Sequence, residues 1–218
     1  APSSTIAATP TTCTISFTDV SVGSTFYEHI RCLACRGIVS GYSDGTYRPN
    51  NPVTRGQLSK IVSGTAGFTE DPGPQMFRDV ATDNTFYQWI NRLARRGLMS
   101  GYSCGGPGEP CIGGMPYFRP SASASRGQTS KIVAGAAYIT QEPSGQTFED
   151  VPLSNPFYRW VEQLASLGVM GGYDCGGVGE PCGPGRRPYF RWGANVTRGQ
   201  TAKIVANTFY PGCAGPSE

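Results

Sequence analysis

The sequence predicts a mainly α-helical protein built from three helix–loop–helix repeats. Two kinds of observation lead to this prediction: short markers recur three times in the same order, and each marker adjoins a stretch with helical periodicity and capping residues. The first marker, Phe-x-Asp-Val, begins at Phe17, Phe77 and Phe148. The second marker, Thr/Ser-Arg-Gly-Gln, begins at Thr54, Ser125 and Thr197. We therefore expect repeats over residues 17–70, 77–140 and 148–210, preceded by an extended arm (1–16) and followed by a tail (211–218).

The first helix of each repeat is predicted from a cap, an apolar stripe and a terminal glycine. Residues that favour the N-cap position are Ser24, Asn84 and Asn155. Apolar or small residues then recur with helical spacing, from position 26 to position 37 in the first copy. Glycines that would end the three helices are Gly37, Gly97 and Gly168.

The second helix of each repeat is predicted to begin with a capping box. The N-cap Thr54, Ser125 or Thr197 is followed three residues later by a glutamine, whose side chain can return to the N-cap backbone. Each cap should contribute about 1 kcal/mol. Apolar pairs that would face the core follow at Ile61–Val62, Ile132–Val133 and Ile204–Val205.

Composition excludes several functional classes. The 218 residues include 30 Gly and 18 Pro, which indicates long turn-rich loops between the helices. No apolar run is long enough to span a membrane, and a net charge of +3 without a basic block argues against nucleic acid as a partner. The single histidine, His29, takes the place of Trp89 and Trp160 in the other copies, which indicates a packing position. We therefore expect no enzyme, no cofactor and no metal site.

Eight cysteines favour disulfides and an extracellular setting. Cys104 and Cys111 bracket a Gly/Pro-rich loop, and Cys175 and Cys182 bracket a near copy of it, so we expect one disulfide within each loop. Zinc is the alternative, but only Cys32-x-x-Cys35 has the usual ligand spacing. The opening Ala1-Pro2-Ser3-Ser4 is typical of a mature end left after removal of a signal peptide.

Four further cysteines leave their pairing open: Cys13, Cys32, Cys35 and Cys213. Cys32 and Cys35 fall on a face of the first helix that we expect to be exposed, which suggests attachment to something outside that helix. In the favoured pairing, the arm and the tail are each bonded to the first helix, within or between subunits. In the alternative, Cys32 bonds Cys35 and Cys13 bonds Cys213.

Residues 37–55, which read GIVSGYSDGTYRPNNPVTR, resemble the core signature of the S-layer homology (SLH) family. Both markers are similar to that family in all three copies. The resemblance implies a three-fold pseudo-symmetric trefoil of paired helices in a cell-envelope protein. It also implies non-covalent attachment to pyruvylated cell-wall polysaccharide in grooves between the repeats.

Candidate glycan-binding residues follow from this resemblance and from the chemistry of the markers. They are Arg55, Arg126, Arg198, Asp19, Asp79, Asp150, Gly41, Gly101 and Gly172. An arginine at the first helical position would stand beside free backbone N–H groups, a combination that suits a carboxylate. The alternatives are that the arginines cover the loops or pair with the marker aspartates, and that the aspartates accept hydrogen bonds within turns.

The sequence departs from the family pattern in two places. The family usually has Thr-Arg-Ala-Glu where this chain has Thr-Arg-Gly-Gln or Ser-Arg-Gly-Gln. The glycine costs the helix up to about 1 kcal/mol relative to alanine. The second and third repeats also carry the cysteine loops as insertions beside the grooves. Because the first repeat keeps the short loop, we expect a glycan carboxylate to bind best at Arg55.

Two functions fit the sequence. The first is a structural protein that self-assembles, as a filament or surface layer, when its β-prone arm (residues 1–16) contacts another copy. The second is an anchor that binds cell-wall polysaccharide; the arm would then fold back on its own domain. The partners are accordingly other copies of the chain or a glycan, and the location is the extracellular cell surface. Asn195-Val-Thr197 is a candidate N-glycosylation site, and the Thr/Ser/Pro-rich opening suits O-glycans.

Overall fold

The computed structural model describes residues 13–213, which form six helices. They are α1 (Tyr27–Cys35), α2 (Arg55–Thr65), α3 (Tyr87–Arg95), α4 (Arg126–Ala136), α5 (Tyr158–Ser166) and α6 (Arg198–Phe209). Within residues 13–213 the extended backbone forms only isolated bridges and no strand. In the same residues, every helix is too short or too polar to cross a membrane. The prediction of a mainly helical chain is confirmed.

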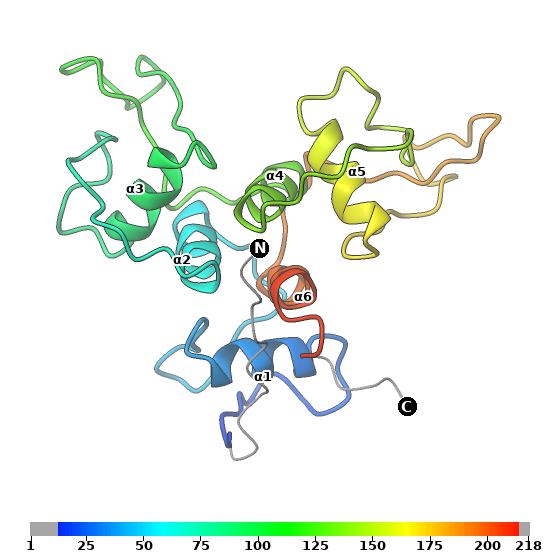
Figure 1. The fold of residues 1–218 in the computed structure, drawn as a ribbon, viewed down its shortest axis with the longest axis horizontal. Coiled ribbons are helices and arrows are strands. Elements are labelled where there is room, and N and C mark those ends of the chain that lie inside the picture. Colours follow the sequence, from blue (N-terminus) through cyan, green and yellow to red (C-terminus); the bar gives the residue numbers. More distant parts are fainter. Residues whose placement is uncertain (1–12, 214–218) are drawn as a thin grey trace.

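The helices form three lobes around a central group (Figure 1). Helices α2, α4 and α6 contact one another at the centre, while α3 packs on α2, α5 on α4, and α1 on α6. The second helix of each repeat therefore pairs with the first helix of the following repeat, and the last repeat closes onto the first. Each lobe consequently contains residues from two repeats.

The first helices begin later than the sequence predicts. The N-caps are Phe26, Phe86 and Phe157, and none of them caps its helix with a side chain. Asn84 and Asn155 instead accept hydrogen bonds from the backbone N–H two residues later, at 2.9 and 2.8 Å. These bonds close a turn in front of the helix, so the prediction of N-caps at Ser24, Asn84 and Asn155 is wrong by two residues.

The other helix ends agree with the sequence. All three capping boxes are present at Thr54, Ser125 and Thr197. Gly37 has φ of 69°, and two hydrogen bonds, Gly37 N–H to Ala34 and Ile38 N–H to Leu33, close the end of α1. This is the Schellman pattern, in which a glycine adopts the left-handed conformation after the last turn.

A closed ring of backbone hydrogen bonds joins the repeats at the centre. The N–H of Val53 donates to the carbonyl of Val196 (2.8 Å), that of Val196 to Ala124 (3.0 Å), and that of Ala124 to Val53 (2.9 Å). These residues directly precede the N-caps of the central helices, and all three are fully buried. Because a buried backbone group must be paired, no repeat can leave the ring without exposing groups on both others.

The glycine after each marker arginine makes room for an aromatic ring of the next repeat. The pairs are Gly56–Phe86, Gly127–Phe157 and Gly199–Phe26. In the first two pairs, an added Cβ would stand 2.5 Å from a ring carbon, well inside van der Waals contact. The departure from the family's alanine thus has a packing reason: the Phe that precedes each first helix lies on the start of the second helix before it.

Four disulfides lie within the chain. Cys104–Cys111 and Cys175–Cys182 close the two loops as expected from the sequence. Cys13–Cys35 and Cys32–Cys213 bond the arm and the tail to α1, which is the pairing that the sequence favours, here within one chain. The expectation of an exposed face is wrong for Cys32, which is buried because the incoming and outgoing segments cover that side of α1.

The Gly–Phe contact predicts a difference between two glycines of α2. Gly56→Ala should lower the free energy of unfolding by about 1–3 kcal/mol, because the new methyl group overpacks against Phe86. In Gly64→Ala the methyl group meets open space, so this control should be neutral or stabilising by up to about 1 kcal/mol. Chemical denaturation measures both values, and equal effects would contradict the proposed contact.

Candidate ligand grooves at the repeat joints

Three grooves occupy equivalent places at the joints between repeats. Their volumes are about 190, 260 and 270 Å³, and we call them grooves 1, 2 and 3 after the repeat whose second helix lines them. One repeat contributes the loop after its first helix, together with a Gln and a Lys of its second helix. The preceding repeat contributes its marker arginine, and the following repeat contributes the Phe that is the N-cap of its first helix. Their cations are Lys60 and Arg198 in groove 1, Lys131 and Arg55 in groove 2, and Lys203 and Arg126 in groove 3.

The arginines of the second marker, which we call the marker arginines, are buried and hydrogen-bond one repeat to the next. In Arg55, Nε donates to the carbonyl of Phe118 (2.8 Å) and Nη2 to that of Ser100 (2.7 Å), both in the second repeat. The other two make the same bonds: Arg126 to Phe190 and Gly171, and Arg198 to Tyr47 and Ser40. The three arginines are only 4–6% exposed. Burial lowers the pKa of the Arg55 guanidinium, which nevertheless stays protonated.

One guanidinium nitrogen of each arginine remains for a ligand. Within the described residues, Nη1 of Arg55, Arg126 and Arg198 makes no hydrogen bond, and none is a buried unpaired atom. Each arginine also lines a groove, so Nη1 is the guanidinium nitrogen that the joint leaves without a protein partner.

The helix N-termini beside these arginines are already occupied, which corrects the expectation of free N–H groups. The N–H of Arg55 donates to the carbonyl of Ala122 (2.8 Å) and that of Gly56 to Pro120 (2.9 Å), both in the next repeat. The N–H of Gln57 donates to the capping side chain of Thr54 (3.2 Å). Equivalent bonds occupy the starts of α4 and α6. An anion in a groove therefore cannot use the N–H groups at these helix starts.

The grooves also differ from the sequence prediction in which arginine serves which loop. The short loop of the first repeat lines groove 1, and the arginine there is Arg198. Arg55 lines groove 2, beside the loop of the second repeat. The expectation that Arg55 serves the short loop is therefore wrong, because each arginine reaches into the repeat that follows it.

The aspartates of the first marker, which we call the marker aspartates, hydrogen-bond the same loop whose carbonyl accepts from a marker arginine. The two carboxylate oxygens of Asp79 accept hydrogen bonds from the backbone N–H groups of Phe118 (2.7 Å) and Arg119 (2.6 Å). Asp19 and Asp150 make the same pair of bonds in their own repeats. This is the turn-acceptor role that the sequence left as an alternative, and it fixes the carbonyl to which Arg55 donates.

The candidate glycines provide space for the marker phenylalanines. An added Cβ on Gly101 or Gly172 would lie 2.7 Å from a ring carbon of Phe77 or Phe148. At Gly41 it would lie 2.5 Å from the Phe17 ring. Gly41 and Gly101 also line grooves 1 and 2, so a side chain at either position would enter the groove or displace the ring.

A second set of arginines was missed by the sequence reasoning. They are Arg48, Arg119 and Arg191, with positive φ of 60°, 59° and 58°. Arg119 lies over one face of the Tyr102 ring at 4.1 Å from its centroid, while Arg55 lies at 5.0 Å. Tyr42 and Tyr173 are flanked by two guanidinium groups in the same way. The signal was present in the sequence, since each of these arginines directly follows the buried aromatic residue of its loop.

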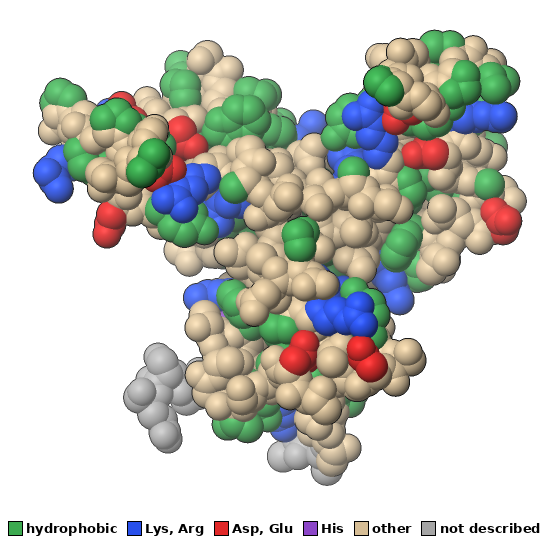
Figure 2. Space-filling view, turned by 180° about the vertical axis from the view of Figure 1, so that it is seen from behind, with side chains coloured by type: hydrophobic (Ala, Val, Ile, Leu, Met, Phe, Trp, Pro, Cys, Tyr) green, Lys and Arg blue, Asp and Glu red, His purple; other side chains and the backbone are tan. Residues whose placement is uncertain are grey.

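The cysteine loops pack onto two of these arginines, Arg119 and Arg191, and leave the grooves open. Glu109 accepts two hydrogen bonds from Arg119 (2.6 and 2.7 Å), and Glu180 accepts two from Arg191 (2.7 and 2.8 Å). These bonds lower the pKa of both carboxyl groups. On the face shown in Figure 2, basic and acidic side chains lie next to each other on every lobe. No residue between Cys104 and Cys111 or between Cys175 and Cys182 lines a groove, so the insertions do not obstruct them.

The lysine is held differently in groove 3. The Nζ atoms of Lys60 and Lys131 lie over the rings of Trp89 (5.2 Å) and Trp160 (5.0 Å). In the lobe formed by α1 and α6, His29 replaces the tryptophan and hydrogen-bonds Asn207 through Nε2 (3.1 Å). Burial and the neighbouring Lys203 lower the pKa of His29. The lysine of groove 3 thus lacks the aromatic platform that the other two have.

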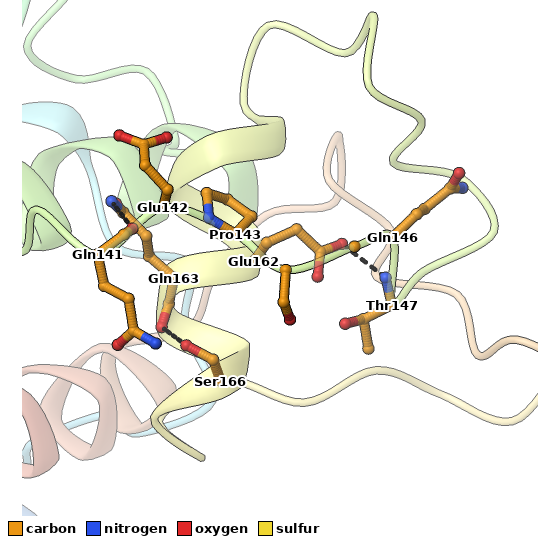
Figure 3. A pocket seen from close by; sticks show the side chains of 10 residues that line it. Gln141, Glu142, Pro143, Gln146, Thr147, Glu162, Gln163 and Ser166 are labelled. Carbon is orange, nitrogen blue, oxygen red and sulfur yellow. Dashed lines mark hydrogen bonds between the residues drawn. The ribbon is translucent and has the colours of Figure 1, made fainter.

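A fourth cavity, of about 260 Å³, lies between α5 and the linker 141–147 (Figure 3). Its lining includes the buried carboxylate of Glu162, which accepts a hydrogen bond from Thr147 N–H (2.9 Å), and the buried amide of Gln163. Because no arginine or lysine is part of its lining, this cavity lacks the cationic character of the three grooves.

The groove geometry defines a class of protein: a ring of helical repeats with cationic grooves at its joints. Residues 16–59 match the family model described as the S-layer homology domain. The chain therefore carries an SLH domain, and its second and third repeats reproduce the capping boxes, arginine bonds and aspartate bonds of the first. The resemblance found in the sequence is confirmed.

Two relatives have names that describe surface proteins. Over 65% of its length the chain is 26% identical to "Cell surface glycoprotein 1" of Acetivibrio thermocellus, of which it covers 6%. Over 88% of its length it is 24% identical to "S-layer protein EA1" of Bacillus anthracis, of which it covers 20%. The chain thus spans a small part of either relative. The chain is an extracellular protein of the cell surface, and the comparisons point to a family of structural proteins rather than enzymes.

The aspartate bonds predict that Asp79 affects folding before it affects binding. Asp79→Asn replaces one of two acceptor oxygens with a donor, so the free energy of unfolding should fall by about 1–3 kcal/mol. Asp83→Asn, at an exposed aspartate of the same repeat, is the matched control and should change stability little. If Asp79→Asn keeps the parent's denaturation midpoint, the aspartate does not hold the loop.

Tyr47 predicts an alkaline loss of stability. Burial raises its pKa to about 12, above the ordinary 10.0. Folding is therefore favoured by the neutral phenol below pH 10, and this contribution, roughly 2–3 kcal/mol, is lost as the pH rises from 10 to 12. Tyr47→Phe should remove that part of the pH dependence and fold normally at pH 7, because Phe118 and Phe190 occupy the same place in the other repeats. Denaturation at several pH values measures it, and an unchanged alkaline profile would contradict this role.

Proposed function

We propose that the protein is a non-enzymatic cell-envelope anchor that binds a carboxylate-bearing cell-wall polysaccharide in its grooves. The observation that carries the proposal is the charge of these grooves. Each cavity is lined by a lysine and by an arginine whose Nη1 makes no hydrogen bond within the described residues, and no acidic side chain is among the lining residues. Two fixed cations suit a carboxylate on a sugar, and the family resemblance suggests a pyruvyl ketal.

Arginine and lysine have separate roles in this proposal. The arginine is rigid because two of its nitrogens hold carbonyls of the next repeat, so it offers one oriented donor. The lysine is a half-buried side chain on the surface of the central helix and supplies a second charge. The marker aspartates and glycines act indirectly: the aspartates orient the loop, and Gly41 and Gly101 keep the groove open.

The three equivalent joints also support the pseudo-three-fold trefoil and the repeat boundaries 17–70, 77–140 and 148–210. A repeating polymer could then engage more than one groove, which would raise its overall affinity without a new contact. We expect no catalysis in the grooves, because their charged side chains are all cations and no histidine lines them.

The lysines test the proposal better than the arginines, whose loss would also disturb the joints. Lys60→Gln/Lys131→Gln/Lys203→Gln should weaken binding to purified pyruvylated polysaccharide at least tenfold in a calorimetric or sedimentation assay. The matched control, Arg78→Gln/Arg95→Gln/Arg186→Gln, removes three exposed charges outside the grooves. It should retain most of the binding, whereas equal losses in the two variants would leave only non-specific attraction.

Self-assembly through the arm is the second candidate function. It is favoured by the relative whose name describes an S-layer protein and by fully exposed Val178 at the tip of a cysteine loop. Residues 1–12, which carry most of the predicted arm, lie outside the described residues, and Cys13 is bonded to α1 of its own chain. Deletion of residues 1–12 followed by electron microscopy tests it: lost polymers with retained glycan binding would support assembly through the arm, and unchanged polymers would exclude it.

A further inference from the structure

We propose that the domain carries mechanical tension from one side of the chain to the other through two disulfides and one turn of α1. The rest of the fold would then bear none of the load. This is a mechanical function of the cysteines, and it does not depend on whether the grooves bind a glycan.

The covalent path follows from the pairing of four cysteines. A pull on the chain before Cys13 passes through the Cys13–Cys35 disulfide into α1. It runs along three peptide units of that helix to Cys32, and from there through the Cys32–Cys213 disulfide to the chain after Cys213. Both disulfides join Cα atoms 5.8 Å apart. The two disulfides thus close residues 14–31 and 36–212 off from the path, so that a pull does not pass through them.

The equivalent helix positions in the other repeats show what the disulfides replace. In the second repeat, Arg92 Nε donates to the carbonyl of Glu70 in the incoming linker (2.8 Å). In the third repeat, Gln163 Nε2 donates to the carbonyl of Gln141 in the next linker (2.8 Å). Those linkers arrive from a neighbouring repeat of the same ring. Of the three first helices, α1 alone is bonded covalently to the segments beside it, through Cys32 and Cys35. It is also the helix at which the chain enters and leaves the ring.

This difference matters under load. A hydrogen bond between protein groups contributes about 1 kcal/mol net and yields to forces that a covalent bond withstands. With hydrogen bonds alone, a pull at the entry would strip the incoming segment from α1 and open the ring, because the joints are interdependent. With the disulfides, the same pull is confined to one helical turn.

The surroundings of the path keep it in place. Cys32 and Cys213 are 2% and 8% exposed, which protects their disulfide from thiols that must reach a sulfur atom to attack it. Arg31 Nη2 donates to the carbonyl of Cys13 (3.3 Å), and the Arg36 guanidinium lies 4.6 Å from the centroid of the Tyr210 ring. Side chains of α1 and of its C-cap residue thus contact the incoming and the outgoing segment, respectively.

Single-molecule force spectroscopy on the full chain tests the proposal, with handles attached before Cys13 and after Cys213. The oxidised parent should lengthen by no more than about 20 Å before a handle fails, since only one helical turn can extend. Reduction with dithiothreitol in denaturant, which exposes the buried Cys32–Cys213 disulfide, followed by refolding in the reductant, should give the same protein an extension of about 700 Å, at up to about 3.6 Å per residue. This comparison needs no variant, so it stands even where a substitution impairs folding.

Two double variants then identify the path by the length they release. Cys32→Ser/Cys213→Ser keeps the Cys13–Cys35 loop closed and should release about 600 Å. Cys13→Ser/Cys35→Ser frees only the segment up to Cys32 and should release about 70 Å. The control Cys104→Ser/Cys111→Ser lies off the path and should stay locked like the parent.

Two results would overturn the proposal. One is an oxidised parent that unfolds over hundreds of ångströms, which would mean that tension passes through the fold. The other is a Cys32→Ser/Cys213→Ser variant that folds, as judged by circular dichroism, and still resists extension. Non-reducing peptide mapping of the parent must also return Cys13–Cys35 and Cys32–Cys213, because Cys13–Cys213 with Cys32–Cys35 would remove α1 from the path.

Discussion

The fold depends on buried guanidinium groups that tie each repeat to the one that follows it. Each marker arginine lies at the start of a central helix and donates to two carbonyls of the next repeat. A buried charge is tolerated only where it is hydrogen-bonded, so the carbonyls must be held in position. The marker aspartates do this by binding the adjacent N–H groups, and the central ring at Val53, Ala124 and Val196 fixes the helix starts. Arginine, loop and aspartate therefore form one connected unit at every joint.

The same constraint explains the position of the grooves. A groove forms where the arginine of one repeat, the central helix of the second and the entry phenylalanine of the third converge, so no isolated repeat contains one. The arginine uses Nε and Nη2 for the joint, and its Nη1 makes no hydrogen bond within the described residues. Assembly and ligand binding thus share a side chain, and loss of that arginine would affect both. The lysines make no hydrogen bond across the joints within the described residues, and Lys60 and Lys131 only lie over a tryptophan of the next repeat. They are therefore the residues on which the two roles separate best.

Much of this could be predicted from local sequence patterns. The capping boxes, the terminal glycines and the disulfide loops are set by nearby residues, and the structure has them where the sequence placed them. The beginning of the first helices was misplaced because asparagine serves equally as an N-cap and as a turn acceptor. What crosses between repeats was not predictable from spacing. Nothing in a linear pattern says that Arg55 reaches Ser100, that α2 packs on α3, or that Gly56 accommodates Phe86 from another repeat.

The central claim is that the three joints form one closed ring that opens only as a whole. Native-state hydrogen exchange at the amides of Val53, Ala124 and Val196 measures this most directly, because each amide donates across a different joint. The account predicts that all three exchange with one opening free energy, equal to that of global unfolding. If one of the three amides exchanges through a smaller opening that spares the other two, a joint opens by itself and the account is contradicted.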